Sequence, residues 1–367
     1  MAFPGIIPHS RSATAITRNK HSNVQLTLLI PDLLPPPGAE RITADTAPIL
    51  RRICGRGTAQ LFASVDIETW LCQAFEVEKQ LNWPVAPLTA QVDALPAESG
   101  CWMRADPVHL QLQRNRSVLL AAPLLEPTAA ETAALTDTLN AHFAADGIRI
   151  AAPHPARWYI NHPDAAAIPG PALSGVAGRP LPRTQLGGHW HRWLTECQML
   201  MHEHAVNISR EQRGLPAINS LLLWGGGSKP AVPGRHFSHV WSADPLATAL
   251  AVQSGAESSI QPNTAAAWLG TLSGKSVTAG ARHLIILEHV LHAARYGGPD
   301  PWMQSVAALE DGWFAPLWSA LGNTIEALDI VATNPDQCMR MVLRPADKMK
   351  FWKRTPDWST LTGVRML

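Results

Sequence analysis

The fold prediction rests on residues 191–227, HRWLTECQMLMHEHAVNISREQRGLPAINSLLLWGGG. Up to residue 205 the apolar side chains recur at helical spacing, which predicts an amphipathic helix with His204 in the middle of its apolar face. Residues 217–224 are short and apolar and three glycines follow, which predicts a buried strand that leaves the core into a tight turn. A polar connection at 207–213 separates the two. Helix, charged loop and buried strand form the arrangement from which α/β proteins build sites at strand ends.

The remainder of the chain alternates short apolar runs with stretches of helical spacing, which predicts an α/β fold. Buried strands are expected at 24–30 and 282–288. Two further apolar runs, at 327–332 and 338–343, are joined by Thr-Asn-Pro-Asp-Gln and predict a hairpin. We therefore expect a mixed sheet with helices on both faces and a C-terminal antiparallel hairpin at 327–343.

The domain prediction has two parts. Residues 1–23 have no continuous apolar run, so they are not a secretory signal, and we expect either a flexible leader or the product of a misplaced start codon. Residues 24–367 are predicted to form a single large α/β domain. The segment 165–188 is rich in Pro and Gly and is either a domain boundary or an ordered active-site loop.

Composition restricts the classes of partner. The 30 basic and 29 acidic residues leave a net charge of +1, which gives no support for a nucleic-acid or membrane partner. No apolar run approaches the roughly 18 residues that span a bilayer. The five cysteines are scattered and lack a CxxC spacing, which indicates reduced thiols and a cytoplasmic location.

The polar residues of the central stretch predict a ligand pocket. Arg210 would offer a planar fork to a carboxylate or phosphate, while Asn207 and Asn219 would orient the ligand. Gly225 would allow close approach of the backbone. The remaining ligand-binding candidates nearby are Glu196, Gln198 and Trp224. An alternative stays open, in which Asn207 and Arg210 tie the loop to backbone carbonyls.

Asp32 follows directly on the first predicted strand, where an acid either faces a ligand or metal or caps the next turn. We take Asp32, His204 and Arg210 as the catalytic candidates. An enzyme would need Asp and His side chains to converge, and the candidates are Asp32, Asp106, His109, His202, His204 and Asp311. His202 and His204 point to opposite sides of a helix, so they cannot share an ion.

Several motifs occur in the order found in a known protein family. They are ADPVHL at 105–110, DG at 146–147, RWYI at 157–160, ECQML at 196–200, HAVNISREQRG at 204–214, INSLLLWGGG at 218–227 and DGW at 311–313. The chain resembles an uncharacterised proteobacterial family whose members are labelled cofactor-independent phosphoglycerate mutase or regulator of pathogenicity factors E. The resemblance covers nearly the whole chain after residue 23.

This resemblance implies an alkaline-phosphatase-like α/β fold with two divalent metals and a serine that is phosphorylated in turnover. Asp32 could match the first metal ligand of that superfamily, whereas its later Asp-His-Gly signature is absent. Two functions follow. The first is a phosphoglycerate-mutase-like or phosphatase-like enzyme acting on a small phosphorylated or carboxylated metabolite. The second is a non-catalytic regulatory or ligand-binding protein on a degenerate enzyme fold, whose Asp and His candidates would be dispersed.

The cofactor and the oligomeric state are left open by the sequence. A divalent metal is compatible with the resemblance. Because ligands are few, we expect less than about one tightly bound divalent ion per chain.

Overall fold

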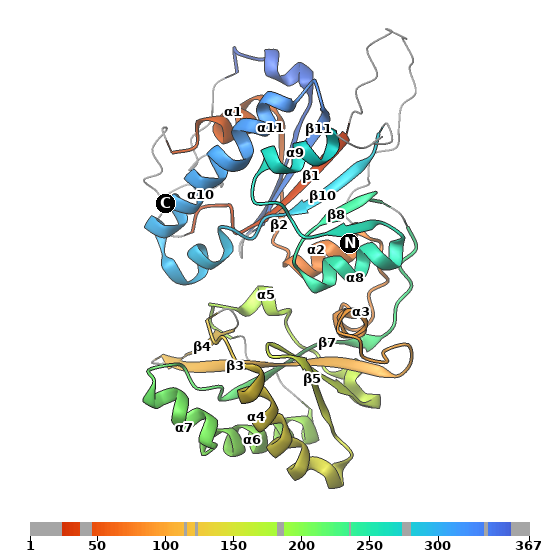
Figure 1. The fold of residues 1–367 in the computed structure, drawn as a ribbon, viewed down its shortest axis with the longest axis vertical. Helices are drawn as coiled ribbons and strands as arrows, with labels where there is room; N and C mark the ends of the chain where they lie inside the picture. Colours follow the sequence, from red (N-terminus) through yellow and green to blue (C-terminus); the bar gives the residue numbers. More distant parts are fainter. Residues whose placement is uncertain are drawn as a thin grey trace.

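The computed structural model describes residues 24–36, 46–113, 116–121, 124–181, 187–234, 236–273, 280–333 and 337–353. The predicted leader, residues 1–23, lies outside the described residues. In Figure 1 a large sheet with its helices occupies the upper part of the molecule, and a smaller sheet lies below it. Among the described residues, no helix combines the length and the apolar character needed to cross a membrane.

The large sheet is mixed and, within the described residues, has seven strands in the order β2-β12-β11-β1-β10-β8-β9. β1 lies between β10 and β11 and is parallel to both, while β12 is antiparallel to β11 and to β2. Its strands are β1 (Val24–Pro31), β2 (Thr58–Ala63), β8 (His239–Trp241), β9 (Glu257–Ser259), β10 (Arg282–Ile286), β11 (Ile325–Thr333) and β12 (Gln337–Leu343). The predicted C-terminal hairpin is confirmed, as is the mixed sheet.

Helices cover both faces of this sheet because successive side chains of a strand point to opposite sides. Leu28 of β1 belongs to the apolar cluster beneath α1, α9, α10 and α11, whereas Leu29 belongs to the cluster beneath α2 and α8. These helices are α1 (Pro48–Arg56), α2 (Ile67–Ala74), α8 (Pro245–Ser254), α9 (Ala265–Ser273), α10 (Pro299–Leu309) and α11 (Ala315–Ala320). The predicted α/β fold with helices on both faces is confirmed.

The small sheet is antiparallel and is built by residues 101–228. β3 pairs with β4, β6 and β7, and β5 pairs with β6. Its strands are β3 (Cys101–Gln113), β4 (Arg116–Leu120), β5 (Ile150–His154), β6 (Arg157–Asn161) and β7 (Ser220–Ser228). One face packs on α4 (Ala129–His142), α6 (Gly188–His202) and α7 (Ala205–Gln212), and the other faces α5 (Leu173–Val176).

The two sheets share one apolar cluster. Leu88 of α3 (Val85–Val92), Trp224 of β7 and Leu250 of α8 all belong to it, so α3 packs between them. The chain leaves the large sheet before α3 and returns at β8. The segment 165–188 therefore connects β6 to α6 within the small-sheet part of the chain. The prediction of one domain over 24–367 stays a prediction.

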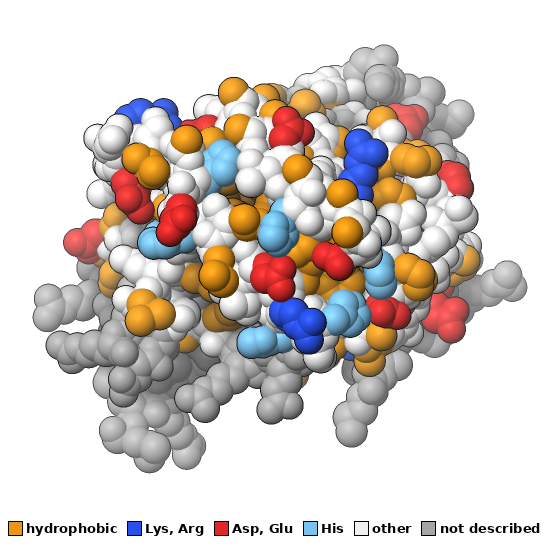
Figure 2. Space-filling model, turned by 90° about the horizontal axis from the view of Figure 1, so that it is seen from below, with side chains coloured by type: hydrophobic (Ala, Val, Ile, Leu, Met, Phe, Trp, Pro, Cys, Tyr) orange, Lys and Arg blue, Asp and Glu red, His pale blue; other side chains and the backbone are white. Residues whose placement is uncertain are grey.

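The outer face below the small sheet carries mixed side chains. Figure 2 shows His, acidic and hydrophobic side chains interspersed there, with Lys and Arg scattered among them. Exposed apolar side chains on this side include Met199 of α6 and Ile208 of α7. That the protein has no nucleic-acid partner remains a prediction from the net charge of its sequence.

The central stretch folds differently from its prediction. α6 ends at His202, and His204 begins a second helix by accepting a hydrogen bond from the backbone N–H of Val206. His204 is therefore a cap and not part of the apolar face of one long helix. The predicted polar connection at 207–213 is mostly helix α7, whose two buried side chains, Asn207 and Arg210, are polar and hydrogen-bonded.

The three glycines 225–227 do not form a turn. They belong to β7, and at Gly226 the neighbouring backbone approaches too closely for a side chain. A Cβ on Gly226 would lie 2.1 Å from the carbonyl oxygen of Ala165. Glycine is required here by contact with the η2 turn (Pro163–Ala167).

We predict that Gly226→Ala destabilises the protein by about 1–3 kcal/mol or more, because the added methyl group overlaps a backbone carbonyl. Urea unfolding measures the effect. Gly270→Ala is the matched control, since Gly270 lies in α9 and a Cβ there meets nothing within 4 Å. That control is expected to gain roughly 0.5–1 kcal/mol. Equal stabilities of the two variants would contradict the close approach.

Candidate functional site

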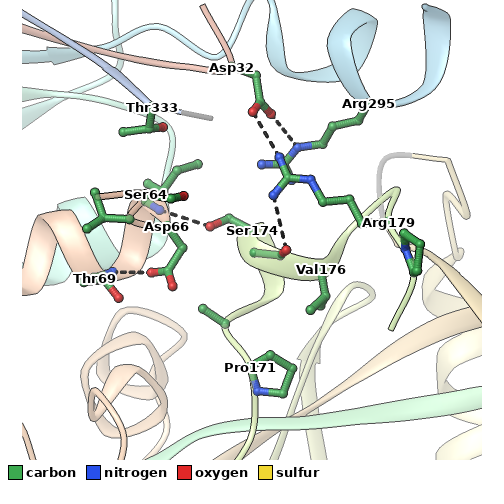
Figure 3. Close-up of a pocket in the computed structure, with 15 residues that line it drawn as sticks. Asp32, Ser64, Asp66, Thr69, Pro171, Ser174, Val176, Arg179, Arg295 and Thr333 are labelled. Atoms are coloured by element: carbon green, nitrogen blue, oxygen red, sulfur yellow. Dashed lines mark hydrogen bonds and ion pairs between the residues drawn. The ribbon is translucent and has the colours of Figure 1, made fainter. Parts of the chain in front are cut away.

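A cavity of about 600 Å³ lies where the carboxyl ends of β1 and β11 meet the start of α2 and the α5 segment (Figure 3). Ligand sites of open α/β sheets commonly occupy this position, outside the carboxyl ends of the strands. We call it the Asp32 cavity. Its lining consists of Asp32, Ser64, Val65, Asp66, Ile67, Thr69, Pro171, Ala172, Ser174, Gly175, Val176, Arg179, Pro180, Arg295 and Thr333.

Asp32 is buried at the wall of this cavity, with 4% of its surface exposed. Its φ angle is +56°, a left-handed conformation that Asp tolerates better than most residues. The backbone holds it there, because its N–H donates to the carbonyl of Thr333 at 2.6 Å and its carbonyl accepts from the indole of Trp302 at 2.9 Å. The carboxylate is consequently fixed at the end of the central strand.

Two arginines bind this carboxylate, one to each oxygen. Arg179 donates from Nη2 to Oδ1 at 3.1 Å, and Arg295 donates from Nε to Oδ2 at 2.7 Å. The Arg295 side chain is only 8% exposed, whereas that of Arg179 is 22% exposed. Arg179 also donates to the carbonyl of Gly175 at 3.2 Å. Two guanidinium groups therefore converge on Asp32 from different segments, as Figure 3 shows.

The opposite wall is the first turn of α2. Asp66 caps this helix, since its Oδ1 accepts from the N–H of Thr69 at 2.6 Å. Ser64 lies just before it, between the end of β2 and the cap. A negative side chain is stabilised at a helix N-terminus, so the charge of Asp66 is partly balanced by the helix.

α5 is tied to α2 through a buried carboxyl group. Ser174 donates its N–H to Glu68 Oε1 at 3.1 Å, and its hydroxyl donates to Oε2. Ser174 Oγ in turn accepts from the N–H of Ile67 at 3.1 Å. Burial, reinforced by the nearby charge of Asp66, raises the pKa of Glu68 to about 7. The cavity is therefore closed on this side by a titratable contact.

Two smaller cavities adjoin the first. One of about 190 Å³ shares Asp66 and Pro171 with it and reaches Trp224 and Gly225. The other, of about 330 Å³, shares Arg295 and contains further carboxyl groups. Burial raises the pKa of one of these, Glu288, to about 7. The three cavities thus share lining residues around the start of α2.

Asn207, Arg210 and Asn219, which were predicted to form a pocket, bind mainly backbone groups and line none of the cavities described above. Arg210 is fully buried and donates from Nε to the carbonyl of Pro216 at 2.8 Å, from Nη1 to Glu131 at 2.8 Å and from Nη2 to the carbonyl of Leu125. This is the alternative that the sequence left open.

The two asparagines have the same kind of role. Asn207 donates to the carbonyls of Met201 and Ile218 at 2.7 and 2.8 Å and accepts from the N–H of Ile218 at 2.8 Å. Asn219 Oδ1 accepts from the N–H of Leu110 at 2.7 Å, and its Nδ2 donates to the Leu110 carbonyl at 3.1 Å. Both side chains hold β7 in place.

The other candidates from the central stretch are also spread out. Glu196 pairs with His142 at 3.3 Å on the surface, and Gln198 donates to Ser220 Oγ at 2.8 Å. His204 lies 3.1 Å from the hydroxyl of Thr138. Trp224 and Gly225 do line a cavity, the second one described above.

The Asp and His candidates for an enzyme do not converge. Asp106 is buried in the small sheet, where it accepts from Arg104 at 2.9 Å and from the Trp224 indole at 2.8 Å. His109, on β3 of the small sheet, lies 2.7 Å from the carbonyl of Ala217. In the part of the chain that the structure describes, no group of three or more His, Cys, Asp or Glu side chains could hold a metal ion.

Sequence reasoning missed Arg179, Arg295, Ser64 and Asp66 as residues of the site. Two signals pointed towards them. The Pro- and Gly-rich segment 165–188 was recognised as either a boundary or an active-site loop, and residues 171–180 of it line the Asp32 cavity. Arg295 follows the strong strand β10 by a few residues, at the π-helical turn η3 (Ala293–Gly297).

Comparison with known proteins identifies a shared fold. No protein-family model matches this chain, and no curated protein matches it. The PH0037 protein from Pyrococcus horikoshii has a solved structure with a TM-score of 0.55 and 13% identity, covering 92% of this chain and 90% of that one. The two chains share a mixed α/β fold. That identity shows the fold and not the activity.

A second solved structure is similar over a comparable length. A cofactor-independent phosphoglycerate mutase from Thermoplasma acidophilum DSM 1728 gives a TM-score of 0.46 and 14% identity, covering 88% of this chain and 90% of that chain. The resemblance of the sequence motifs to the proteobacterial family stays a prediction.

We predict that Asn207→Ala destabilises the protein by roughly 2–4 kcal/mol, since three buried backbone hydrogen bonds lose their partner. Chemical denaturation measures this. Gln212→Ala, an exposed position on the same helix, is the control and should change the stability by less than about 0.5 kcal/mol. An unchanged stability of Asn207→Ala, with loss of ligand binding, would restore the predicted ligand role.

The raised pKa of Glu68 predicts a pH dependence of stability. The folded protein holds this proton up to about pH 7, whereas the unfolded chain releases it near the ordinary value of 4.5. The contribution of Glu68 to the free energy of unfolding is therefore fully present below the ordinary pKa of 4.5 and is lost as the pH rises through about 7.

We expect Glu68→Gln to remove this decrease in stability at higher pH, because an amide keeps an acceptor for Ser174 without ionising. The measurement is the unfolding free energy of both proteins from about pH 4.5 to about pH 8. The variant should gain relative to the parent as the pH rises. Glu78→Gln, at an exposed position, is the control and should follow the parent. Parallel curves for Glu68→Gln and the parent would contradict the buried, shifted carboxyl group.

Proposed function

We propose that the protein binds a small phosphorylated or carboxylated metabolite in the Asp32 cavity. In this proposal it is a ligand-binding or regulatory protein on a phosphoglycerate-mutase-like, alkaline-phosphatase-like fold. The observation that carries the proposal is the convergence of Arg179 and Arg295 on one cavity wall. A guanidinium group matches carboxylate and phosphate oxygens with paired hydrogen bonds.

Direct hydrogen bonding, more than net charge, would select the anion. The charged residues of the lining are two arginines and two aspartates, so their charges cancel. Asp66 is directed at the backbone of α2 and Asp32 at the arginines. Among the described residues Arg295 is hydrogen-bonded through Nε, which leaves its two Nη groups for a ligand. The volume of about 600 Å³ suits a small molecule.

Hydroxyl groups complete this wall. Ser64, Thr69 and Thr333 all line the cavity, and each hydroxyl is a donor or acceptor for ligand oxygens. Sites for small ligands typically combine an apolar lining with a few polar groups of this kind, and here Val65 and Val176 provide apolar surface.

A two-metal site, as the sequence resemblance implies, does not fit the residues present. Such a site needs several carboxylate and imidazole ligands close together. The described lining offers two carboxylates, Asp32 and Asp66, and both already accept hydrogen bonds. No phosphoryl-transfer step through metal ions is derived for this site.

A mutase-like or phosphatase-like activity is the second candidate. The position of Ser64 favours it, because this hydroxyl lies on the cavity wall at the end of β2, directly before α2. Turnover of phosphoglycerate that disappears in Ser64→Ala, with ligand binding retained, would establish the enzyme. The cytoplasmic location stays a prediction from the cysteines, which are all free in the structure.

The binding proposal predicts that inorganic phosphate and 3-phosphoglycerate bind the full chain, as measured by titration calorimetry. Arg295→Ala should weaken binding by about 10–100-fold, the range expected for loss of a charge-assisted hydrogen bond. Arg157→Ala is the matched control. Arg157 forms a comparable ion pair with Asp93, but it lines none of the cavities described above.

The control should bind like the parent protein. If neither anion binds the parent protein, or if both arginine variants lose binding equally, the Asp32 cavity is not the site.

A further inference from the structure

Asp32 occupies the position at which the sequence resemblance places a metal ligand, directly after the first strand. In the structure both of its carboxylate oxygens are already bound to cations. Oδ1 accepts from Arg179 and Oδ2 from Arg295, at 3.1 and 2.7 Å. Asp32 itself is buried, with 4% of its surface exposed.

A divalent ion bound to Asp32 would lie close to both guanidinium groups. Metal–oxygen distances are roughly 2.0–2.2 Å, shorter than the contacts that the arginines make. Three cations would then share one buried carboxylate, and like charges repel strongly where water is excluded. The arginines would have to leave, and their side chains are 78% and 92% buried.

Among the described residues, the other carboxyl groups near this site already have a hydrogen-bond partner or a raised pKa. Asp66 accepts from the N–H of Thr69, and both oxygens of Glu68 accept from Ser174. Glu288 lies in the adjoining cavity, and the raised pKa of Glu68 and Glu288 favours their protonated forms, which bind metals poorly. The described lining of the Asp32 cavity contains no histidine or cysteine.

We infer that Arg179 and Arg295 take the place of divalent ions beside Asp32, so that this site binds its anionic ligand through guanidinium groups without a metal. This inference rests on the proposed function. Asp32 is then a positioning residue, which orients the two guanidinium groups towards the cavity, and the arginines contact the ligand.

The geometry supports this division of roles. Arg179 comes from the segment after α5 and Arg295 from the turn after β10, and Figure 3 shows their guanidinium groups side by side at Asp32. Because the carboxylate already restrains both arginine side chains, they lose less conformational entropy when a ligand binds. Arginine stays charged at every physiological pH, so this positive charge does not depend on the supply of metal.

The test is the binding of inorganic phosphate to the full chain, first after dialysis against EDTA and then with added manganese. We expect dissociation constants that agree within about twofold in the two conditions. Elemental analysis of protein purified without chelator should give less than about one divalent ion per chain.

The outcomes separate the two proposals. Binding only with manganese, or close to two bound metal ions per chain, overturns the inference and leaves the proposed function standing. No phosphate binding in either condition overturns both. Binding in both conditions with a low metal content supports both.

Two variants test the assigned roles. Arg295→Lys keeps the positive charge but loses the planar fork, and we expect about tenfold weaker phosphate binding with an unchanged response to EDTA. Arg157→Lys is the matched control, because it makes the same substitution in the ion pair with Asp93. Folding of each variant is checked by its thermal transition.

Asp32→Asn distinguishes a positioning residue from a metal ligand. It keeps one acceptor but replaces the other by an NH2 donor, so one guanidinium group loses the contact that orients it, and phosphate should bind more weakly with or without manganese. The loss of a metal ligand would instead be compensated by excess manganese. Weaker phosphate binding by Asp32→Asn, rescued by excess manganese, would overturn the inference.

Discussion

The carboxylate of Asp32 joins three segments that are distant in the sequence. It lies at the end of the central strand of the large sheet and binds Arg179, 147 residues away, and Arg295, 263 residues away. Leaving one of these charges without a partner in a buried place is costly, so the segments after α5 and β10 are held where they meet. The position of the cavity wall follows from this ion pair network.

A second set of contacts holds the small sheet against the large one. The apolar cluster around α3 joins Trp224 of β7 to Leu250 of α8, and the hydrogen bonds of Glu68 tie α5 to α2. Burial of apolar surface supplies most of the cohesion, whereas the carboxyl group determines where α5 lies. The raised pKa of Glu68 makes this second contact sensitive to pH.

Large parts of the fold were predictable because their signals are local. The apolar run at 24–30, the strand at 282–288 and the hairpin at 327–343 are all read from the period of neighbouring residues. The break between α6 and α7 was not predictable in this way, because His204 fits an apolar helical face as well as it fits a cap. The three consecutive glycines of β7 likewise predict a turn from sequence alone. Only the contact of Gly226 with the carbonyl of Ala165 shows why glycine is required in this strand.

The sequence by itself determined the α/β class and the mixed sheet, and it singled out Asp32 as a candidate at the end of the first strand, since each depends on residues within one element. The tertiary structure alone decided which charged side chains meet. Arg210 resembles a ligand-binding arginine in the sequence, yet its partners are the carbonyls of Pro216 and Leu125 and the carboxylate of Glu131. Arg179 and Arg295 carry no motif, and they face a cavity because the packing of two sheets brings distant segments together. Hydrophobic periodicity reports the burial of an element, but it holds no information on the partner of a polar side chain.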